Sequence, residues 1–390
     1  MKKGGELDFE FSTTDRIIFG PGKLNQVGSL ATNLGERAMV VVGSRTDSAA
    51  SLFGFLSDAR IHITLFKVYS EPSVEVVREG LQLARQQTCD MVIGFGGGSV
   101  LDTAKTIAIM MTNPGEITDY LEVIGRGQAF TRPSVPTIAI PTTAGTGTEV
   151  TRNAVLVDPS HRIKVSLRSQ WILPKVALID PELTYNLPKE ITASSGLDAL
   201  TQLIEPYVSN KANPLTDVLC REGIQRVARS LYRAYKDGKD ISARLDMSVA
   251  SLFGGMALAN AKLGLVHGFA GVLGGMYHAP HGAVCARLLP FVVEKNTDAL
   301  QERAPKNDAL NRYQEIASIL TGEPNASVKQ GINWIDDLCA MLNVPPLGIY
   351  GLQPGDFSDI VEKTALASST QGNPITLASI ELTEILSRAI

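Results

Sequence analysis

Three of the five histidines in the chain, His267, His278 and His281, lie within residues 264–290. Imidazole is the commonest metal ligand among side chains. In one continuous helix His267 and His281 would share a face but lie about 21 Å apart, too far for one ion. Gly274-Gly275 and Pro280 interrupt the stretch, however, and favour a break. We therefore predict that the chain folds back here and brings the histidines towards a shared metal.

The predicted helix over residues 194–208 is a second segment with polar side chains that could bind a metal. Asp198, Gln202 and Glu205 recur at i, i+4 and i+7, which places them on one face. A buried aspartate on an apolar helix is costly without a partner, and a cation would supply one. Considered alone, the helix favours a solvated or cap-paired aspartate, and only together with His267 and His281 does it favour a metal ligand. Pro206 removes the helical hydrogen bond to the Gln202 carbonyl, so we expect the helix to end or kink there.

Two loops have the composition of a phosphate site. GFGGGSVLDTAK, residues 94–105, leaves an apolar strand through three consecutive glycines and enters a predicted helix. Glycines allow backbone N–H groups to approach a pyrophosphate, and a helix N-terminus favours the anion. PTTAGTGTEVT, residues 141–151, offers hydroxyl groups and free amides after another strand. The alternatives are a tight strand-to-helix turn and a polar surface loop.

The end of the strand at residues 38–42 bears on the choice of nucleotide. Gly43, Ser44 and Arg45 follow it. An acidic side chain at such a position pairs with the adenosine ribose and disfavours a 2′-phosphate, and none stands there. This favours NADPH over NADH, unless Arg45 is simply solvated.

The bulk composition limits the functional class. A length of 390 residues favours two domains. The net charge of −4 without a Lys/Arg stripe argues against nucleic acid as a partner. We find no uninterrupted apolar run of the ~18 residues that a membrane span needs and no signal-peptide core, and the four cysteines are scattered. We therefore expect a cytoplasmic protein without membrane segments.

The pattern of elements changes halfway along the chain. Short apolar strands are expected at residues 38–42, 62–68, 91–94, 137–140 and 176–179, with helices such as 73–87 and 99–111 between them. This alternation predicts a doubly wound parallel sheet, which binds ligands at the carboxyl ends of its strands. From residue 188 helical periodicity dominates. The predicted domains are an α/β nucleotide-binding domain over 1–187 and an all-α metal-binding domain over 188–390.

Taken together, the motifs resemble the group III, iron-containing alcohol dehydrogenases. The resemblance covers nearly the whole chain and includes IIFGPGKL, GGGSVLDTAK, PTTAGTGTEVT, DPELTYNLP, SGLDALTQLIEPYVS and VHGFAGVLGGMYHAPHG, in the order of the family. It implies a fold like that of dehydroquinate synthase, with a divalent metal and NAD(P) in a cleft between the domains. It also implies small alcohols or aldehydes as substrates, and we expect a homodimer.

Carried over by position, the resemblance assigns the site residues. Asp198, His267 and His281 would be metal ligands, and Asn153 would lie near the substrate. The expected cofactor-binding residues are Gly43, Ser44, Gly96, Gly97, Gly98, Ser99, Asp102, Thr142, Thr143, Thr146 and Lys164.

Two departures from the family pattern concern imidazoles. The family usually has a ligating histidine where this chain has Gln202, and often a histidine at the position of Gly271. An amide oxygen is a much weaker ligand for iron or zinc, so Gln202 is retained only as a candidate ligand. His278 could replace a missing imidazole, or it could shape the cleft wall and relay protons.

The sequence therefore predicts a metal-dependent, NAD(P)-linked alcohol dehydrogenase or carbonyl reductase with Fe2+ or Zn2+. Three alternatives stay open. They are a metal-poor, non-catalytic dimeric relative, a lyase like dehydroquinate synthase, and a reductase of a carboxylate-bearing substrate such as maleylacetate. Arg152 beside Asn153 is the only local hint of the last.

Overall fold

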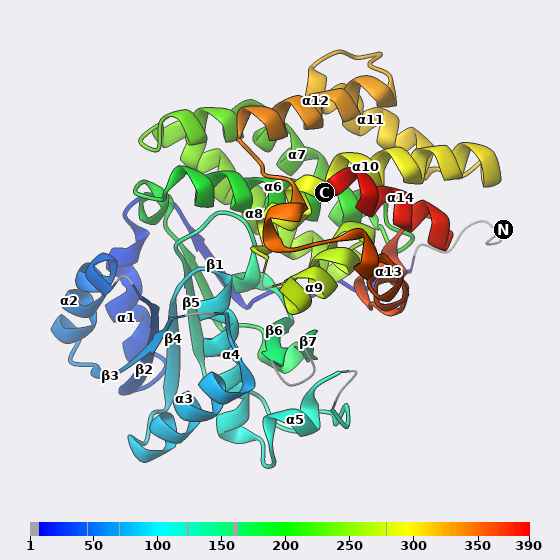
Figure 1. Ribbon diagram of the computed structural model, residues 1–390. Coiled ribbons are helices and arrows are strands. Elements are labelled where there is room, and N and C mark those ends of the chain that lie inside the picture. Colours follow the sequence, from blue (N-terminus) through cyan, green and yellow to red (C-terminus); the bar gives the residue numbers. More distant parts are fainter. Residues whose placement is uncertain (1–7, 45, 70, 123–124, 159–162, 278) are drawn as a thin grey trace.

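The computed structural model describes residues 8–44, 46–69, 71–122, 125–158, 163–277 and 279–390. Figure 1 shows an N-terminal half built on a sheet and a C-terminal half built from helices, with α9 facing the hairpin of β6 and β7 where the halves meet. A parallel sheet followed by an all-helical region confirms the predicted fold class.

The central sheet has six strands, all paired in parallel. In spatial order they are β1 (Arg16–Phe19), β8 (Val176–Ile179), β5 (Thr137–Pro141), β4 (Met91–Gly96), β2 (Arg37–Gly43) and β3 (His62–Val68). The five strands expected from apolar runs are all present. The strand β1 lies within the motif IIFGPGKL and its flanking residue.

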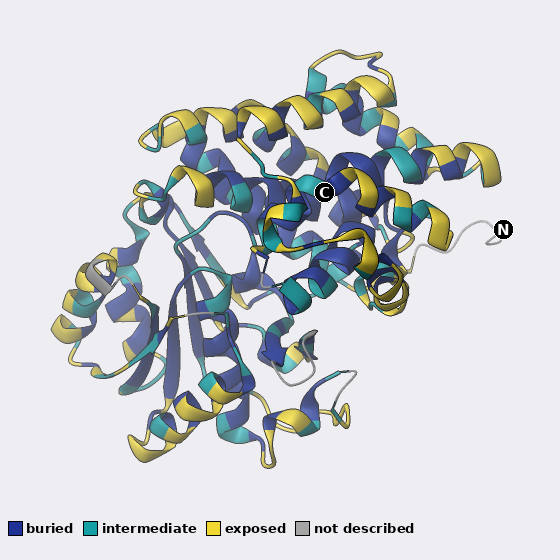
Figure 2. Cartoon of the chain, viewed as in Figure 1, coloured by how far each residue is buried: buried dark blue, intermediate teal, exposed yellow. Residues whose placement is uncertain are grey.

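Helices cover both faces of the sheet. Along β2, Val40 and Val42 belong to the core shared with α1 (Val27–Thr32) and α2 (Ala50–Asp58). Met39 and Val41 point to the other core, shared with α3 (Val74–Gln86) and α4 (Gly98–Thr112). Successive side chains of a strand alternate between faces, so a strand covered on both sides is apolar throughout. Figure 2 shows these strands as buried.

The order of strands fixes where a ligand can bind. β3 and β4 are consecutive in the chain but flank β2, so the chain reverses its direction of travel at the boundary between β2 and β4. Ligands of open α/β sheets bind in the crevice outside the carboxyl ends of the strands at such a reversal. Gly43 at the end of β2 and Gly97 directly after β4 lie at this carboxyl edge of the sheet.

A two-stranded antiparallel hairpin was not predicted. It consists of β6 (Asn153–Asp158) and β7 (Ile163–Arg168) and packs against α4 and α9. The strands are short and carry charged residues, and nothing in the local sequence shows that they leave the main sheet. The small helix α5 (Ile117–Tyr120) is the remaining α-helix of this half.

The second half contains α6 (Lys189–Val208), α7 (Pro214–Lys236), α8 (Ile241–Ala261), α9 (Leu265–Tyr277), α10 (His281–Arg303), α11 (Ala309–Thr321), α12 (Val328–Met341), α13 (Phe357–Leu366) and α14 (Ser379–Ala389). Its apolar faces share one core. The predicted interruption at Pro280 is confirmed, because α9 ends at Tyr277 and α10 begins at His281. The predicted break at Gly274-Gly275 is wrong, because both glycines lie within α9.

The predicted end of the helix at Pro206 is not seen, and a kink there stays a prediction. α6 continues through Pro206 to Val208. The proline lies in the last turn, where its missing N–H removes a single bond and the chain leaves the helix two residues later.

Taken singly, none of the helices in the described ranges has the length and apolar composition needed to cross a membrane. Only α8 and α9 together meet these criteria, and they are bent by 100° at their junction.

Candidate metal centre and cofactor cleft

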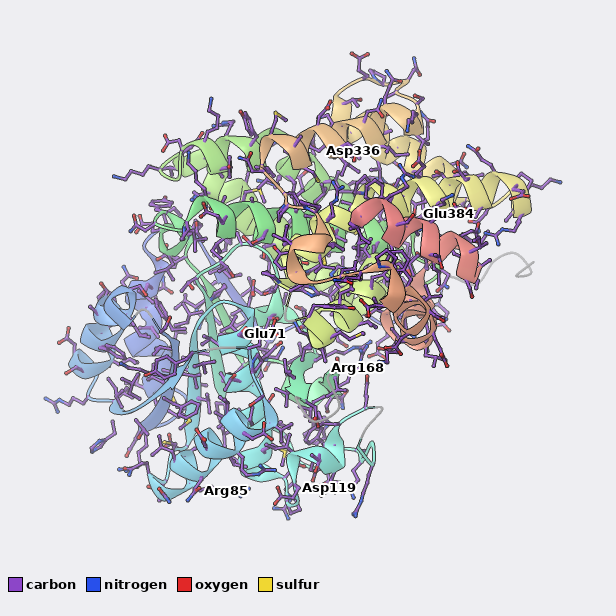
Figure 3. All side chains as sticks on the ribbon, viewed as in Figure 1. Glu71, Arg85, Asp119, Arg168, Asp336 and Glu384 are labelled. Atoms are coloured by element: carbon purple, nitrogen blue, oxygen red, sulfur yellow. The ribbon has the colours of Figure 1, made fainter. Side chains whose placement is uncertain are left out.

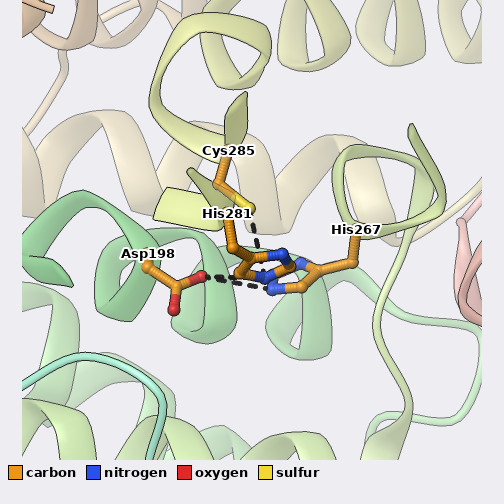
Figure 4. Close-up of side chains that lie close together, drawn as sticks. All are labelled: Asp198, His267, His281 and Cys285. Carbon is orange, nitrogen blue, oxygen red and sulfur yellow. Dashed lines mark hydrogen bonds and ion pairs between the residues drawn. The ribbon is translucent and has the colours of Figure 1, made fainter. Parts of the chain in front are cut away.

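Four potential metal ligands converge from three helices of the second half. Asp198 comes from α6, His267 from α9, and both His281 and Cys285 come from the first two turns of α10 (Figure 4). One ligand atom from each of the four lies within 4.8 Å of all the others. The turn between α9 and α10 folds His281 back on His267, as predicted, and their ring centroids are 5.4 Å apart.

The distances between these atoms fit two ligands of one small cation. Asp198 Oδ1 lies 3.5 Å from His267 Nε2 and 3.5 Å from His281 Nε2. Two oxygen or nitrogen ligands about 2.1 Å from a tetrahedral zinc ion would be about 3.4 Å apart. Asp198 Oδ1 and His267 Nε2 are both buried and have no hydrogen-bond partner. Buried polar atoms without partners are rare in proteins, and a bound cation would satisfy both atoms.

Glu205 holds His267 in the orientation that a metal ligand requires. Its buried carboxylate accepts hydrogen bonds from His267 Nδ1 at 2.6 Å, Val266 N at 2.6 Å and Gly264 N at 2.9 Å. In the neutral ring, with Nδ1 donating to Glu205, the other ring nitrogen would present its lone pair to a metal. Such outer carboxylates fix the tautomer and orientation of ligating histidines. The sequence placed Glu205 on the same face as Asp198 but did not indicate this role.

The pKa values of the two histidines move in opposite directions. Burial lowers the pKa of His267, but the Glu205 and Asp198 carboxylates outweigh it and raise the pKa to about 9. Burial lowers the pKa of His281 to about 4, assisted by the charges of His267 and Lys164. Without a metal, the His267 ring therefore carries a second proton at pH 7, whereas the His281 ring is neutral and has a free lone pair.

Gln202 lies beside the cluster and is hydrogen-bonded to it. Its Nε2 donates to Asp198 Oδ2 at 2.9 Å, and its buried Oε1 has no partner. This arrangement orients the aspartate. The structure does not decide whether Gln202 binds a metal, so its role as a ligand stays a prediction.

Gly271 and His278 are the two other positions at which the sequence bears on the number of imidazoles near the metal. An added Cβ at Gly271 would have no heavy atom within 4 Å, so the space beside α9 is open at this point. His278 lies outside the residues that the structure describes, as does Arg45.

The glycine loop after β4 and the threonine loop after β5 lie against each other. Thr142 N donates to Gly96 O at 2.9 Å. An added Cβ at Gly97 would lie 3.3 Å from Thr143 Cγ2, and one at Gly98 would lie 2.9 Å from Thr146 Cγ2. Such close approach requires glycine. Most of the residues in these two loops are buried. The predicted cofactor-binding residues that are partly exposed are Gly97, Gly98, Ser99, Thr142, Thr143 and Thr146.

The same loops reach the metal centre through the start of α6. An added Cβ at Gly145 would lie 2.8 Å from Ser195 O, one turn before Asp198. An added Cβ at Gly282, next to His281, would lie 2.3 Å from Ser194 O. The threonine loop and the start of α10 therefore meet at neighbouring residues of α6. The candidate nucleotide-binding loops and the donor cluster are therefore neighbours in the structure.

Lys164 lies between the two halves of the molecule. It projects from β7, forms an ion pair with Glu71 at 2.5 Å, and would lie 2.7 Å from a Cβ added at Gly274 of α9. Figure 3 labels Glu71 close to the junction of the sheet and α9. The structure thus places the ammonium group next to the metal-binding half, and its contact with a cofactor stays a prediction.

Asp102 faces inward rather than towards the crevice. Its Oδ2 accepts from Val155 N at 3.1 Å, and Lys105 Nζ lies 3.8 Å from Oδ1. Lys105 in turn bonds to Thr148 O and Thr151 Oγ1 at 3.0 Å each. Burial raises the pKa of Asp102 to about 6 and lowers that of Lys105 to about 8. This buried pair ties α4 to the hairpin and the threonine loop, and the role of Asp102 in cofactor binding stays a prediction.

Two further residues named from the sequence flank the hairpin. Asn153 begins β6, is partly exposed, and uses its carbonyl to accept from Lys105. Arg152 pairs with Glu10 at 3.5 Å, so its guanidinium is already engaged.

Comparison with known proteins identifies the family. Residues 14–181 match the model of the family described as iron-containing alcohol dehydrogenase, and residues 192–390 match that of its C-terminal region. Alcohol dehydrogenase 4 of Saccharomyces cerevisiae is 35% identical over 378 residues, covering 95% of this chain and 96% of its own. The NADPH-dependent butanol dehydrogenase of Clostridium saccharobutylicum is 34% identical over 392 residues, covering 96% of each chain.

A solved structure extends the agreement to three dimensions. The alcohol dehydrogenase from Oenococcus oeni superposes with a TM-score of 0.90 at 31% identity, covering 98% of this chain and all of its own. The family models together span both halves, and the relatives match over nearly their whole length. The chain therefore belongs to the iron-containing alcohol dehydrogenase family.

Proposed function

We propose that the protein is a metal-dependent, NAD(P)-linked alcohol dehydrogenase or carbonyl reductase acting on small alcohols or aldehydes. The observation that carries the proposal is the convergence of Asp198, His267 and His281 beside the glycine and threonine loops. Family membership supports the reaction class. When bound, Fe2+ or Zn2+ would act as a Lewis acid on the substrate oxygen, and the nicotinamide would donate or accept the hydride.

The chain's own residues contribute position and charge. Asp198, His267 and His281 would hold the metal, and Glu205 keeps the His267 ring oriented. The first turn of α4 and the loop of Thr142, Thr143 and Thr146 would hold the nucleotide phosphates, because unpaired N–H groups at a helix N-terminus favour anions. Lys164 would stand close to the nicotinamide end. Protons would leave through water, the ribose hydroxyl or His278.

The test is metal analysis of protein purified without chelator, followed by oxidation of NADPH and NADH over a panel of small aldehydes and keto acids. Asp198→Ala should lose both the metal and the activity, because a central ligand is gone. Asp359→Ala, on the exposed surface of α13, is the matched control and should retain both. Full activity in Asp198→Ala would refute the proposal. Absence of both metal and nucleotide binding in the wild type would favour the non-catalytic alternative.

We also propose NADPH as the preferred cofactor. Gly43 and Ser44 end β2 at the crevice without an acidic side chain, and Ser44 is exposed there. Ser44→Asp should lower kcat/KM with NADPH relative to NADH, because a carboxylate repels the 2′-phosphate and accepts from the ribose hydroxyls. Ser57→Asp, at the other end of α2, should leave the ratio unchanged. An unchanged ratio in Ser44→Asp would contradict the assignment.

A carboxylate-bearing substrate stays an alternative, because the ion pair of Arg152 with the exposed Glu10 is weak and leaves the guanidinium able to exchange partners. A cytoplasmic homodimer with domains at residues 1–187 and 188–390 stays a prediction. Light scattering of the purified protein would test the oligomeric state.

A further inference from the structure

The fourth member of the donor cluster is a cysteine that sequence reasoning passed over. Cys285 is fully buried, on α10, and four residues after His281. Side chains at i and i+4 of a helix lie on one face, so α10 presents an imidazole and a thiol side by side. This spacing was the available signal, but the scattered cysteines suggested only a reduced protein.

The position of the sulfur fits coordination to the same ion as the histidines. Cys285 Sγ lies 3.7 Å from His281 Nε2. For zinc–sulfur and zinc–nitrogen bonds of about 2.3 Å and 2.05 Å in a tetrahedral site, this separation would be about 3.6 Å. The remaining ligand-atom pairs of the cluster are all within 4.8 Å. The partnerless, buried Asp198 Oδ1 and His267 Nε2 independently indicate a cation at this point.

The competing fourth ligand is Gln202, and its chemistry is weaker. Its Nε2 is engaged with Asp198 Oδ2. A thiolate binds zinc and iron far more strongly than an amide oxygen does. Without a metal, burial and the nearby carboxylates of Asp198 and Glu205 raise the pKa of Cys285 well above its usual value. A coordinating metal reverses this and deprotonates the thiol.

We propose that Cys285, as a thiolate, is the fourth protein ligand of the metal centre with Asp198, His267 and His281. Binding of the ion releases the thiol proton to solvent, and the soft sulfur makes the site select zinc over manganese or magnesium. The inference rests on the proposed metal-dependent function and adds a ligand and a metal preference to it.

The experiment uses cobalt as a spectroscopic substitute in the full-length protein. Metal-free wild type loaded with one equivalent of Co2+ should show a near-ultraviolet thiolate-to-cobalt charge-transfer band. Cys285→Ala should lose the band while cobalt still binds through the other three ligands. Cys220→Ala, which removes another fully buried thiol on α7, should keep it. Circular dichroism checks that both variants are folded.

A second measurement needs no variant. X-ray absorption of the zinc-loaded wild type should show one sulfur neighbour at about 2.3 Å besides nitrogen and oxygen neighbours at about 2.0–2.1 Å. Cobalt or zinc bound without any sulfur signature would overturn the role of Cys285 and leave the proposed function intact. Failure of the wild type to bind either ion would overturn the metal centre itself, and this inference with it.

Discussion

The substitution Glu205→Gln replaces one carboxylate oxygen with an NH2 group beside the candidate metal ligand His267. The carboxylate uses both oxygens: Oε1 accepts from Val266 N, and Oε2 accepts from Gly264 N and His267 Nδ1. Glutamine has one acceptor oxygen, so whichever way the amide turns, at least one of these buried donors faces an NH2 group. The variant therefore tests whether the carboxylate itself matters, rather than the size of the side chain.

The expected cost follows from these three bonds. A buried N–H left without an acceptor costs roughly 1–3 kcal/mol, and a bond to a neutral acceptor is worth about 1 kcal/mol less than one to a charged acceptor. One bond lost and two weakened give about 3–5 kcal/mol, similar to breaking a buried ion pair. This is a large share of the roughly 5–15 kcal/mol that stabilises a typical domain.

Urea unfolding of the metal-free protein at pH 7 measures the effect, with Glu384→Gln as the control. Glu384→Gln makes the same chemical change at an exposed carboxylate that pairs with Lys295. It should lower the free energy of unfolding by no more than about 0.5 kcal/mol. Zinc affinity of Glu205→Gln should fall about 10–100-fold, because the His267 ring loses its fixed orientation. Equal unfolding midpoints for the two variants, with unchanged zinc affinity, would refute the role assigned to Glu205.

Three further predictions concern other parts of the structure. Gly271→Ala should stabilise the protein by about 0.5–1 kcal/mol in urea unfolding, because a helical glycine gains a Cβ in open space. Gly268→Ala should destabilise it, because that Cβ would meet Thr370 Oγ1 at 2.1 Å. A destabilised Gly271→Ala would contradict this. Gln202→Ala should lower zinc affinity by less than Cys285→Ala does, and the reverse order in a zinc titration would identify the amide as the ligand. The free energy of unfolding of Asp102→Asn relative to wild type should rise by up to about 3 kcal/mol between pH 4 and pH 7. A pH-independent difference would show that the pKa of Asp102 is not raised in the fold.

The sign of the pH effect follows from the raised pKa of Asp102. The folded value of about 6 exceeds the ordinary value of 3.8, so the neutral carboxyl is favoured in the fold. The wild type has this stability in full below pH 3.8 and loses it as the pH rises through 6. Asparagine does not ionise, so the variant gains relative to wild type over that window, which paired urea titrations at several pH values would measure.

Much of the first half could be predicted from local sequence. Strands buried on both faces must be apolar throughout, so Val40 and its neighbours indicated a covered parallel sheet without further information. Three glycines between a strand and a helix likewise marked a place where backbone N–H groups are free for a ligand. The hairpin of β6 and β7 could not be foreseen, because strands with charged residues show no preference for leaving the sheet until α4 and α9 cover them.

The sequence by itself determined which residue types could form the centre and where the chain must turn. His267, His281 and Asp198 were identifiable as candidates because a buried aspartate beside paired histidines favours a cation, and because Pro280 interrupts the helix between the two histidines. Only the tertiary structure decided what completes the set. Cys285 and Glu205 gain their roles from distances between α6, α9 and α10, and such distances depend on how three apolar helices pack, which no local pattern of residues encodes.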